Sequence, residues 1–376
     1  MEKVKISEVC NISNGFAFKS EKYVNDNGAR VIRITNVQKG KIVDNDPKLY
    51  PFSELDKLEA YKIFEGDILM SLTGNVGRVG RFPKELLPAY INQRVCRVMP
   101  KNEKLDTNFL FHFLNSDVFE NEAIKNSAGA AQLNLSTKWL GDFEIPLPPL
   151  ATQQRIAAIL DQADAIIQNN RAIVQKYDAL TQSLFLDMFG DPVKNEKGWE
   201  KKEFSKVAKN ENSKRIPVKQ SDRDEREGEY PYYGATGIID TIDDYKFDGE
   251  YLLIAEDGKN LLFRKKNNAF MAYGKFWVNN HAHILSCNNI CNLKYLEFFL
   301  NSIDLSPFIS GIDQIKLNKA SLDRIPVIVP PLELQNQFAE RVAMIEAQKQ
   351  QAQLELAKSE ELFASLLQRA FNGELN

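Results

Sequence analysis

The sequence predicts an α+β protein in which two globular modules of mixed α/β content are separated by two long helices that form an antiparallel intramolecular coiled coil. Three observations lead to this prediction: an internal repeat, two long stretches of apolar residues at helical spacing, and short β-rich runs between turn residues. We expect the modules at residues 1–147 and 191–328, and the helical segments at residues 148–190 and 329–376.

The internal repeat is clearest around two Pro-Pro-Leu sequences, Leu147-Pro-Pro-Leu150 and Val329-Pro-Pro-Leu332. Aligning residues 148–190 with residues 330–372 gives 12 identities over 43 positions. Weaker similarities extend into the modules, where Ile6–Val9 matches Phe204–Val207 and Tyr90–Val98 matches Trp277–Leu285. The same unit of module and helix is therefore predicted twice.

Each helical segment contains a stripe of residues at alternating intervals of three and four, which is typical of a coiled-coil seam. Residues 151–189 contain neither Gly nor Pro, and at about 1.5 Å per residue such a helix spans roughly 58 Å. We expect these seam residues: Ile156, Ile159, Ala163, Ile166, Asn170, Ile173, Tyr177, Leu180 and Leu184 in the first helix, and Phe338, Val342, Ile345, Lys349, Ala352, Leu356, Ser359, Phe363, Leu366 and Ala370 in the second. The module between them can return the chain, so we predict antiparallel pairing; the alternative is two helices packed separately on their own modules.

The modules contain short runs of β-forming residues rather than alternating strands and helices. In the first module we expect strands at residues 30–34, 67–72 and 94–98 and a helix at residues 107–116. In the second module we expect strands at residues 250–255 and 276–285 and a helix at residues 293–301.

Composition excludes several classes of protein. Lys and Arg number 48 and Asp and Glu number 51, so the net charge of −3 excludes a simple polybasic nucleic-acid binder, and 23 Phe and 12 Tyr exclude an acidic disordered chain. Residues 1–149 carry 20 basic and 19 acidic residues and residues 191–329 carry 21 of each, so the excess of acidic residues lies in the helical segments.

Few cysteines and no apparent export segment indicate a reducing cytoplasm.

Motifs that would indicate catalysis are weak. The glycines of Gly74-Asn-Val-Gly-Arg-Val-Gly80 do not match a nucleotide-binding fingerprint. His281-Ala-His283 with Cys287 and Cys291 could suggest zinc, but the repeat places Arg94 and Cys96 at the two histidine positions. Asp257-Gly-Lys259 could suggest a nuclease cluster, yet its counterpart is Thr73-Gly-Asn75. We therefore expect no catalytic residue, metal or cofactor in this chain.

The remaining candidates are basic, amide and hydroxyl side chains near loops, which can read base edges or hold phosphates. The DNA-contacting candidates are Arg33, Asn36, Arg78, Arg81, Asn92, Gln93 and Arg94 in the first module, and Tyr233, Thr236, Lys259, Arg264, Lys265, Lys275, Asn279 and Asn280 in the second. His281, next to Asn280, is a further candidate of the same kind.

The order of module, Pro-Pro-Leu helix, module and Pro-Pro-Leu helix resembles the specificity subunit of Type I restriction–modification systems. The residues that carry this resemblance are Leu147–Ile156, Phe189–Pro192, Pro231–Ile238 and Phe247–Leu253, followed by Glu256-Asp-Gly258. The second copy departs from the pattern in having Asn336 where Gln154 stands, and in its more acidic helix.

The resemblance implies a non-catalytic, double-stranded-DNA-binding subunit of a prokaryotic complex. It implies two target-recognition domains, each of which reads one half of a bipartite asymmetric site, and a coiled coil that sets the gap and docks two methyltransferase subunits. S-adenosylmethionine, ATP and Mg²⁺ would then be used by the methyltransferase and restriction subunits. A change of about four residues in one helix should alter the gap.

Two other functions remain open at this point. A self-sufficient DNA nuclease or methyltransferase would show turnover without partner subunits. A coiled-coil scaffold that binds only protein would show no sequence-selective DNA binding even when assembled.

Overall fold

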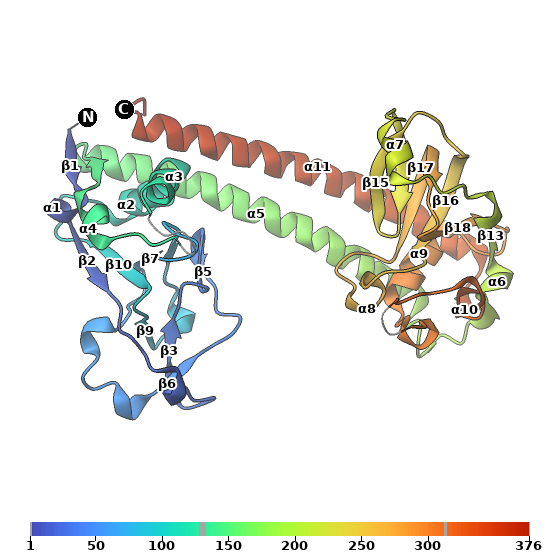
Figure 1. The fold of residues 1–376 in the computed structure, drawn as a ribbon, viewed down its shortest axis with the longest axis horizontal. Helices are drawn as coiled ribbons and strands as arrows, with labels where there is room; N and C mark the ends of the chain where they lie inside the picture. Colours follow the sequence, from blue (N-terminus) through green and yellow to red (C-terminus); the bar gives the residue numbers. More distant parts are fainter. Residues whose placement is uncertain (1, 128–132, 312–313, 376) are drawn as a thin grey trace. The chain divides into compact units, whose positions relative to one another are not determined.

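The computed structural model describes residues 2–127, 133–311 and 314–375 of the chain. These residues form two compact units. Unit 1 comprises residues 1–171 and 354–376, and unit 2 comprises residues 172–353 (Figure 1). Within the described ranges, every helix is too short or too polar to cross a lipid bilayer.

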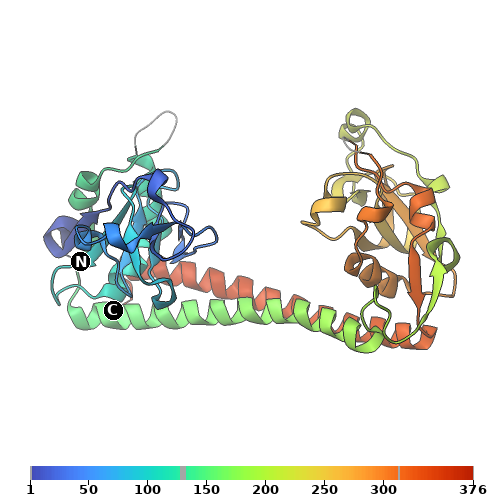
Figure 2. The ribbon, with the colours of Figure 1, turned by 90° about the horizontal axis from the view of Figure 1, so that it is seen from below.

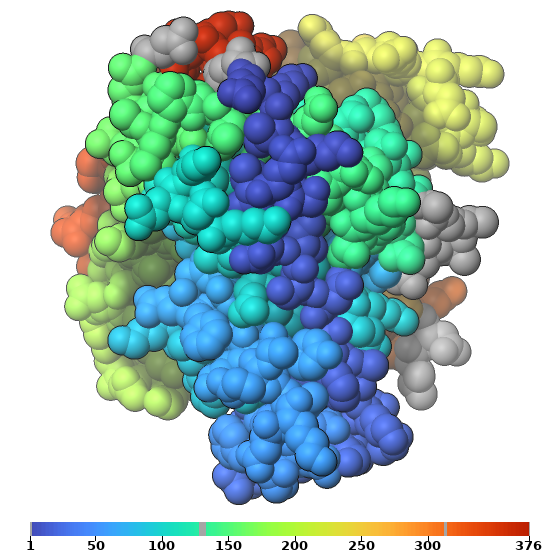
Figure 3. Space-filling model, turned by 90° about the vertical axis from the view of Figure 1, so that its left-hand side faces the viewer, coloured from blue at the N-terminus to red at the C-terminus, as the bar shows by residue number. Residues whose placement is uncertain are grey.

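Unit 1 contains the first module. Its elements are β1 (Lys3–Lys5), α1 (Ile6–Val9), β2 (Cys10–Asn14), β3 (Gly28–Ile32), β4 (Val37–Gln38), β5 (Gly40–Ile42), β6 (Leu49–Pro51), β7 (Ile68–Ser71), β8 (Val79–Arg81), β9 (Ala89–Ile91), β10 (Val95–Pro100), α2 (Thr107–Leu114), α3 (Asp117–Lys125), α4 (Thr137–Asp142) and β11 (Glu144–Pro146). The N-terminal segment, dark blue in Figure 3, crosses the face of the module that this figure shows, and its strand β1 pairs with β11.

Unit 2 contains the second module. Its elements are β12 (Glu200–Glu203), α6 (Phe204–Val207), β13 (Ala208–Asn210), α7 (Gln220–Asp224), β14 (Tyr230–Gly234), β15 (Gly237–Ile242), β16 (Phe247–Ala255), α8 (Asn260–Phe263), β17 (Ala269–Val278), β18 (Ala282–Cys287), α9 (Leu293–Ser302), α10 (Lys319–Asp323) and β19 (Pro326–Val329).

The first four strands of the two six-stranded sheets follow the same chain order, but the last two do not. The six-stranded sheet of unit 1 has the order β2-β10-β7-β8-β5-β4, and that of unit 2 has the order β13-β18-β16-β17-β14-β15. In both sheets the fifth strand is parallel to the fourth, and the remaining neighbours are antiparallel. Unit 1 adds a three-stranded sheet, β6-β3-β9. β5 is the second strand of its hairpin and β14 is the first, so the repeat predicted from a few short similarities extends through four strands of the sheet. The predicted α+β class is confirmed.

One predicted strand was wrong. Residues 276–285 do not form a single strand, because β17 ends at Val278 and β18 begins at Ala282. The buried side chain of Asn279 accepts a hydrogen bond from the backbone of His281 at 2.8 Å and so closes a tight turn between the two strands.

The two long helices, α5 (Leu150–Phe189) and α11 (Leu332–Phe371), have 40 residues each and are antiparallel, as predicted (Figures 1 and 2). In unit 1, Asn170 of α5 donates to Ser359 of α11 at 2.9 Å, whereas Ile156, nearer the start of α5, packs with Ala370 at the end of α11. In unit 2, Phe185 and Phe189 at the end of α5 pack on Phe338 near the start of α11.

The seam of α11 consists of the expected residues. In the seam of α5, every second expected residue is replaced by the residue that follows it. Ile166, Ile173 and Leu180 are 51%, 42% and 49% exposed, and Ile159 is only partly buried. The residue after each of them lies deeper in its unit: Leu160, Ile167, Val174 and Thr181. Apolar residues occupy both alternatives in three of these pairs, so the apolar pattern of one helix could not distinguish them. The seam of α5 actually contains Ile156, Leu160, Ala163, Ile167, Asn170, Val174, Tyr177, Thr181 and Leu184.

Replacing the polar seam residue Asn170 with Leu is expected to raise the melting temperature and to loosen the register of the helices. The substitution buries more apolar surface but removes the hydrogen bond to Ser359, which keeps its own bond to the Glu355 carbonyl. The gain should be on the order of 1 kcal/mol, measured by calorimetry. The exposed neighbour Asn169 provides the control, since Asn169→Leu should change stability by less than about 0.5 kcal/mol. A lower melting temperature for Asn170→Leu would contradict this account of the seam.

Two buried glutamines, which the sequence showed only as an identity in the repeat, join each long helix to its module. The Gln153 amide donates to the Pro148 and Lys104 carbonyls at 2.8 and 2.9 Å, and its oxygen accepts from the Asp106 backbone at 2.8 Å. Gln335 donates to the Pro330 carbonyl at 2.7 Å and accepts from the Asn292 backbone at 2.9 Å. Asp106 and Asn292 are the N-caps of α2 and α9, so the Pro-Pro-Leu-x-x-Gln motif fixes the start of a long helix to a short helix of the module.

Candidate nucleic-acid interface

The same turn occurs once in each module, between β9 and β10 in unit 1 and between β17 and β18 in unit 2. Asn92 and Asn279 begin these turns and are 9% and 7% exposed. Each side-chain oxygen accepts the backbone N–H two residues later, at 3.4 Å from Arg94 and at 2.8 Å from His281. The carbonyls of Arg94 and His281 accept from the backbones of Leu72 and Glu256, each at 2.9 Å. Asn92 and Asn279 were expected to contact DNA, but their side chains close the turns instead.

Two further segments meet each turn and form what we call the loop edge of the module. The first follows the neighbouring strand, at Thr73–Asn75 after β7 and at Asp257–Lys259 after β16. The second precedes the short helix α4 or α10, where Leu135 donates to the Leu72 carbonyl and Leu317 donates to the Glu256 carbonyl, both at 2.8 Å. The loop edges are therefore built alike in the two modules, with different exposed side chains.

In unit 1 the exposed side chains of the turn belong to Gln93 and Arg94, with Asn75 and Asn134 on the adjoining segments. Among the described residues, neither Gln93 nor Arg94 has a side-chain hydrogen bond or ion pair. Both side chains are exposed at this edge, and their contact with DNA stays a prediction.

In unit 2 the loop edge is hollowed by two pockets of about 410 and 340 Å³, and His281 lines both. Its Nδ1 lies 2.7 and 2.9 Å from the two carboxylate oxygens of Asp257. Lys219 lines the first pocket, and Lys259 and Lys316 line the second. These lysines are exposed, and within residues 133–311 and 314–375 none has an ion-pair partner. Unpaired ammonium groups around these two pockets are suited to contact phosphates.

A buried histidine is hydrogen-bonded to two segments behind the loop edge of unit 2. His283 is fully buried, and its Nε2 donates to the Leu317 carbonyl at 2.7 Å while its Nδ1 accepts from Asn212 at 2.7 Å. Burial lowers the pKa of His283, so the neutral ring connects β18 to the segment that carries Lys316. His281, exposed in the turn, and His283, buried in β18, therefore have different surroundings.

The side chains of the other expected residues of the first module contact groups of the protein itself. Asn36 is buried, and its amide donates to the Val43 carbonyl and to Asp44. Arg33 bonds to Asp46, Arg78 lies 3.6 Å from Glu120, and Arg81 stacks over Phe111 at 4.6 Å. The side chain of Asn36 serves the local fold rather than a ligand, contrary to the expectation.

In the second module only Asn280 and Lys259 of the expected residues are exposed at the loop edge beside His281. Tyr233 packs on Phe270 and Phe276, Thr236 lies in the β14–β15 turn, and Lys275 lies over Tyr245 at 4.7 Å. Arg264 donates to the Asn301 carbonyl, next to the exposed Lys265. Lys219 and Lys316 were absent from the expected set.

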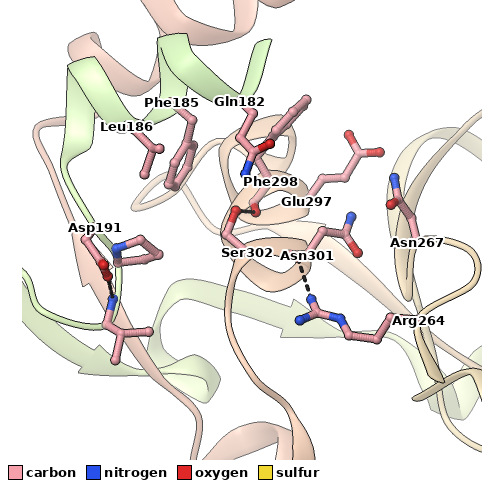
Figure 4. Close-up of a pocket in the computed structure, with 12 residues that line it drawn as sticks. Gln182, Phe185, Leu186, Asp191, Arg264, Asn267, Glu297, Phe298, Asn301 and Ser302 are labelled. Carbon is pink, nitrogen blue, oxygen red and sulfur yellow. Dashed lines mark hydrogen bonds between the residues drawn. The ribbon is translucent and has the colours of Figure 1, made fainter. Parts of the chain in front are cut away.

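A second kind of site is a pair of pockets related by the repeat. One pocket, of about 480 Å³, lies in unit 1 between α2, α5 and α11, and the other, of about 530 Å³, lies in unit 2 between the end of α5 and α9 (Figure 4). Equivalent positions line both: Phe111, His112, Asn115, Ala364 and Leu367 in the first, and Glu297, Phe298, Asn301, Gln182 and Phe185 in the second.

The chemistry of the two pockets differs. In the first, the buried His112 bonds through Nε2 to Asp161 at 2.7 Å, and burial lowers the pKa of this imidazole. In the second, burial raises the pKa of Glu297, whose carboxylate lies 2.8 Å from Lys294. Leu186, labelled in Figure 4, and Val193 line the second pocket and are 45% and 65% exposed, so part of its lining is exposed apolar surface.

Comparison with known proteins gives consistent matches. The family model described as "Type I restriction modification DNA specificity domain" matches residues 1–176 and 196–356. A putative type I restriction enzyme specificity subunit of Haemophilus influenzae is 39% identical over 137 residues, which is 36% of this chain and 34% of the relative. The MjaVIII specificity subunit of Methanocaldococcus jannaschii is 34% identical over 45% of this chain and 41% of the relative, so both matches span less than half of the relatives' length.

A longer match reaches the EcoprrI specificity subunit of Escherichia coli, which is 24% identical over 89% of this chain and 85% of the relative. Among solved structures, the Type I restriction–modification S subunit from M. genitalium has a TM-score of 0.60 at 16% identity, over 98% of this chain and 96% of that one. At this identity the likeness concerns the fold. The family model covers both modules and most of both long helices, and it shows that the chain belongs to the Type I restriction modification DNA specificity domain family.

Proposed function

We propose that this chain is the sequence-specific DNA-binding subunit of a Type I restriction–modification complex, and that each module reads one half of a bipartite asymmetric site. The observation that carries the proposal is the loop edge, which is built by the same backbone contacts in both modules and presents different side chains. Two copies of one reading surface fit two half-sites, and different side chains on them fit two different sequences.

The charge distribution supports weak binding by the isolated chain. Each module is close to neutral overall, so long-range attraction to DNA is small, while exposed lysines lie at the loop edge of unit 2. Tight binding would then require partner subunits to complete the enclosure of the duplex.

We propose two methyltransferase subunits as partners, docked at the two repeat-related pockets and the adjoining helix surfaces. Equivalent pockets in two units fit two copies of one protein. The exposed Ile166 on α5 in unit 1, and Leu186 on α5 in unit 2, add apolar surface that such a partner would cover. Restriction subunits would join this complex, and S-adenosylmethionine, ATP and Mg²⁺ would act in the partner subunits while this chain itself remains non-catalytic.

Methylome sequencing tests this function directly. Cells that express the chain with its methyltransferase are expected to carry methylation within a bipartite motif that is lost when the chain is deleted. The purified chain alone, incubated with DNA, Mg²⁺ and S-adenosylmethionine, is expected to show neither cleavage nor methyl transfer. Turnover by the chain alone would favour a self-sufficient enzyme, and an assembled complex without sequence-selective DNA binding would favour a protein scaffold.

A further inference from the structure

We propose that Arg94 and His281 are the specificity-determining residues at equivalent positions of the two modules, and that each reads a base edge in its own half-site. This inference rests on the proposed function, because it requires each module to bind duplex DNA. It adds a residue-level reason why the two half-sites should differ.

The two positions are structurally equivalent. Val95 pairs with Ser71 at the start of β10, and Ala282 pairs with Ala255 at the start of β18, so the preceding residues Arg94 and His281 occupy the same place in their turns. The backbone at each position is held by the asparagine side chain at the start of the turn and by the N–H of the neighbouring strand. Because two hydrogen bonds fix the backbone of each turn, little backbone entropy is lost when a side chain of the turn binds a ligand.

Arg94 has the chemistry that recognises guanine. Its guanidinium carries only donors in a planar fork, and guanine presents two acceptors, O6 and N7, in the major groove. The side chain is exposed, and no described residue forms an ion pair with it. A bidentate contact would therefore not require a bond within the protein to be broken.

His281 has a different preference because Asp257 orients it. The carboxylate accepts from Nδ1–H, so a ring with its single proton on Nδ1 presents an unprotonated Nε2, and half of the side chain (51%) is exposed. An acceptor at this place suits the amino group of adenine N6 or cytosine N4 in the major groove. Asp257 is a positioning residue, because it acts through His281.

His281 lies between two pockets lined by lysines, as expected for a residue at the centre of a DNA-contacting surface. Lys219 and Gln220 line the pocket on one side of it, and Lys259 and Lys316 line the pocket on the other. Lysines on both sides can hold phosphates and so place the base edge against the imidazole.

Exchanging the two residues tests the proposal. Complexes reconstituted with the methyltransferase subunits would carry Arg94→His or His281→Arg, and methylation would be measured over a library randomised in both half-sites. Arg94→His should reduce the preference for guanine at one position of one half-site by about tenfold and leave the other half-site unchanged. His281→Arg should shift one position of the other half-site toward guanine.

Two further variants separate base reading from a structural role. Asp257→Asn should weaken the base preference at the same position as His281→Arg, and Arg94→Lys should weaken it at the same position as Arg94→His despite the retained charge. The exposed Lys57→His and Lys201→Arg are matched controls distant in sequence from the loop edges, and both should keep the wild-type motif.

The proposal is overturned if the exchanged complexes keep every base preference of the wild type. It is also overturned if Arg94→His and His281→Arg lower methylation equally at all sequences, since that result would indicate phosphate contacts or lost folding. Failure of the proposed function would look different, because the wild-type complex itself would then select no bipartite motif.

Discussion

Phe189→Ala is expected to lower the free energy of unfolding of unit 2 by about 3–5 kcal/mol. Phe189 is fully buried at the end of α5, and its ring centroid lies 4.8 Å from that of Tyr295, 5.1 Å from Phe185 and 5.3 Å from Phe338. Truncation removes three aromatic contacts at once and leaves a cavity where α5, α9 and α11 meet. Denaturant titration followed by hydrogen exchange with mass spectrometry would resolve the loss in residues 172–353.

The control for this substitution is three residues away on the same helix. Leu186 is 45% exposed, and Leu186→Ala should change the unfolding free energy by less than about 1 kcal/mol. Hydrogen exchange in unit 1 should be unchanged in both variants. Equal losses for Phe189→Ala and Leu186→Ala would show that the aromatic cluster is not what anchors the end of α5.

Deleting one heptad from each long helix is expected to change the DNA target rather than abolish recognition. Removal of residues 171–177 and 352–358 keeps the seam in phase and shortens each helix by about 10 Å. If the helices set the gap, the methylated motif should keep both half-site sequences with a gap shorter by about three base pairs, at 3.4 Å per base pair. Methylome sequencing of the reconstituted system measures this change.

A variant of unchanged length provides the comparison. Arg171→Ala with Lys176→Ala alters exposed side chains of the same α5 heptad, removes the ion pair of Arg171 with Glu360 at 2.6 Å, and should keep the wild-type gap. An unaltered gap in the shortened complex would exclude the helices as the element that sets it.

Much of the fold could be predicted because the chain repeats itself. The helix boundaries followed from Pro148, Pro149 and Gly190, since proline starts and glycine ends a helix for reasons that are local to the backbone. The seam of α11 could be predicted because few apolar residues compete for it. On α5, shifting the α11 seam back by 182 residues indicates Leu160 and Ile167, so the repeat held the correction that the apolar pattern alone did not.

The candidate site was harder to predict, because its residues come from three segments that are distant in sequence. Asn92, Asn279 and Asn36 have side chains suited to base recognition, yet all three are buried and bond to the protein. Polar residue types do not reveal whether their hydrogen bonds go to the backbone or to a ligand. That distinction depends on burial, which the sequence does not contain.

By itself the sequence determined that the chain is two related modules with two long helices, because repeats, helix-breaking residues and heptad spacing act over short stretches of backbone. Only the tertiary structure decided which asparagines close turns, and that Arg94 and His281, which the repeat aligns, are both exposed at the loop edges. These outcomes depend on packing and hydrogen bonds between segments more than 20 residues apart, such as Leu72 with Arg94 and Asp257 with His281.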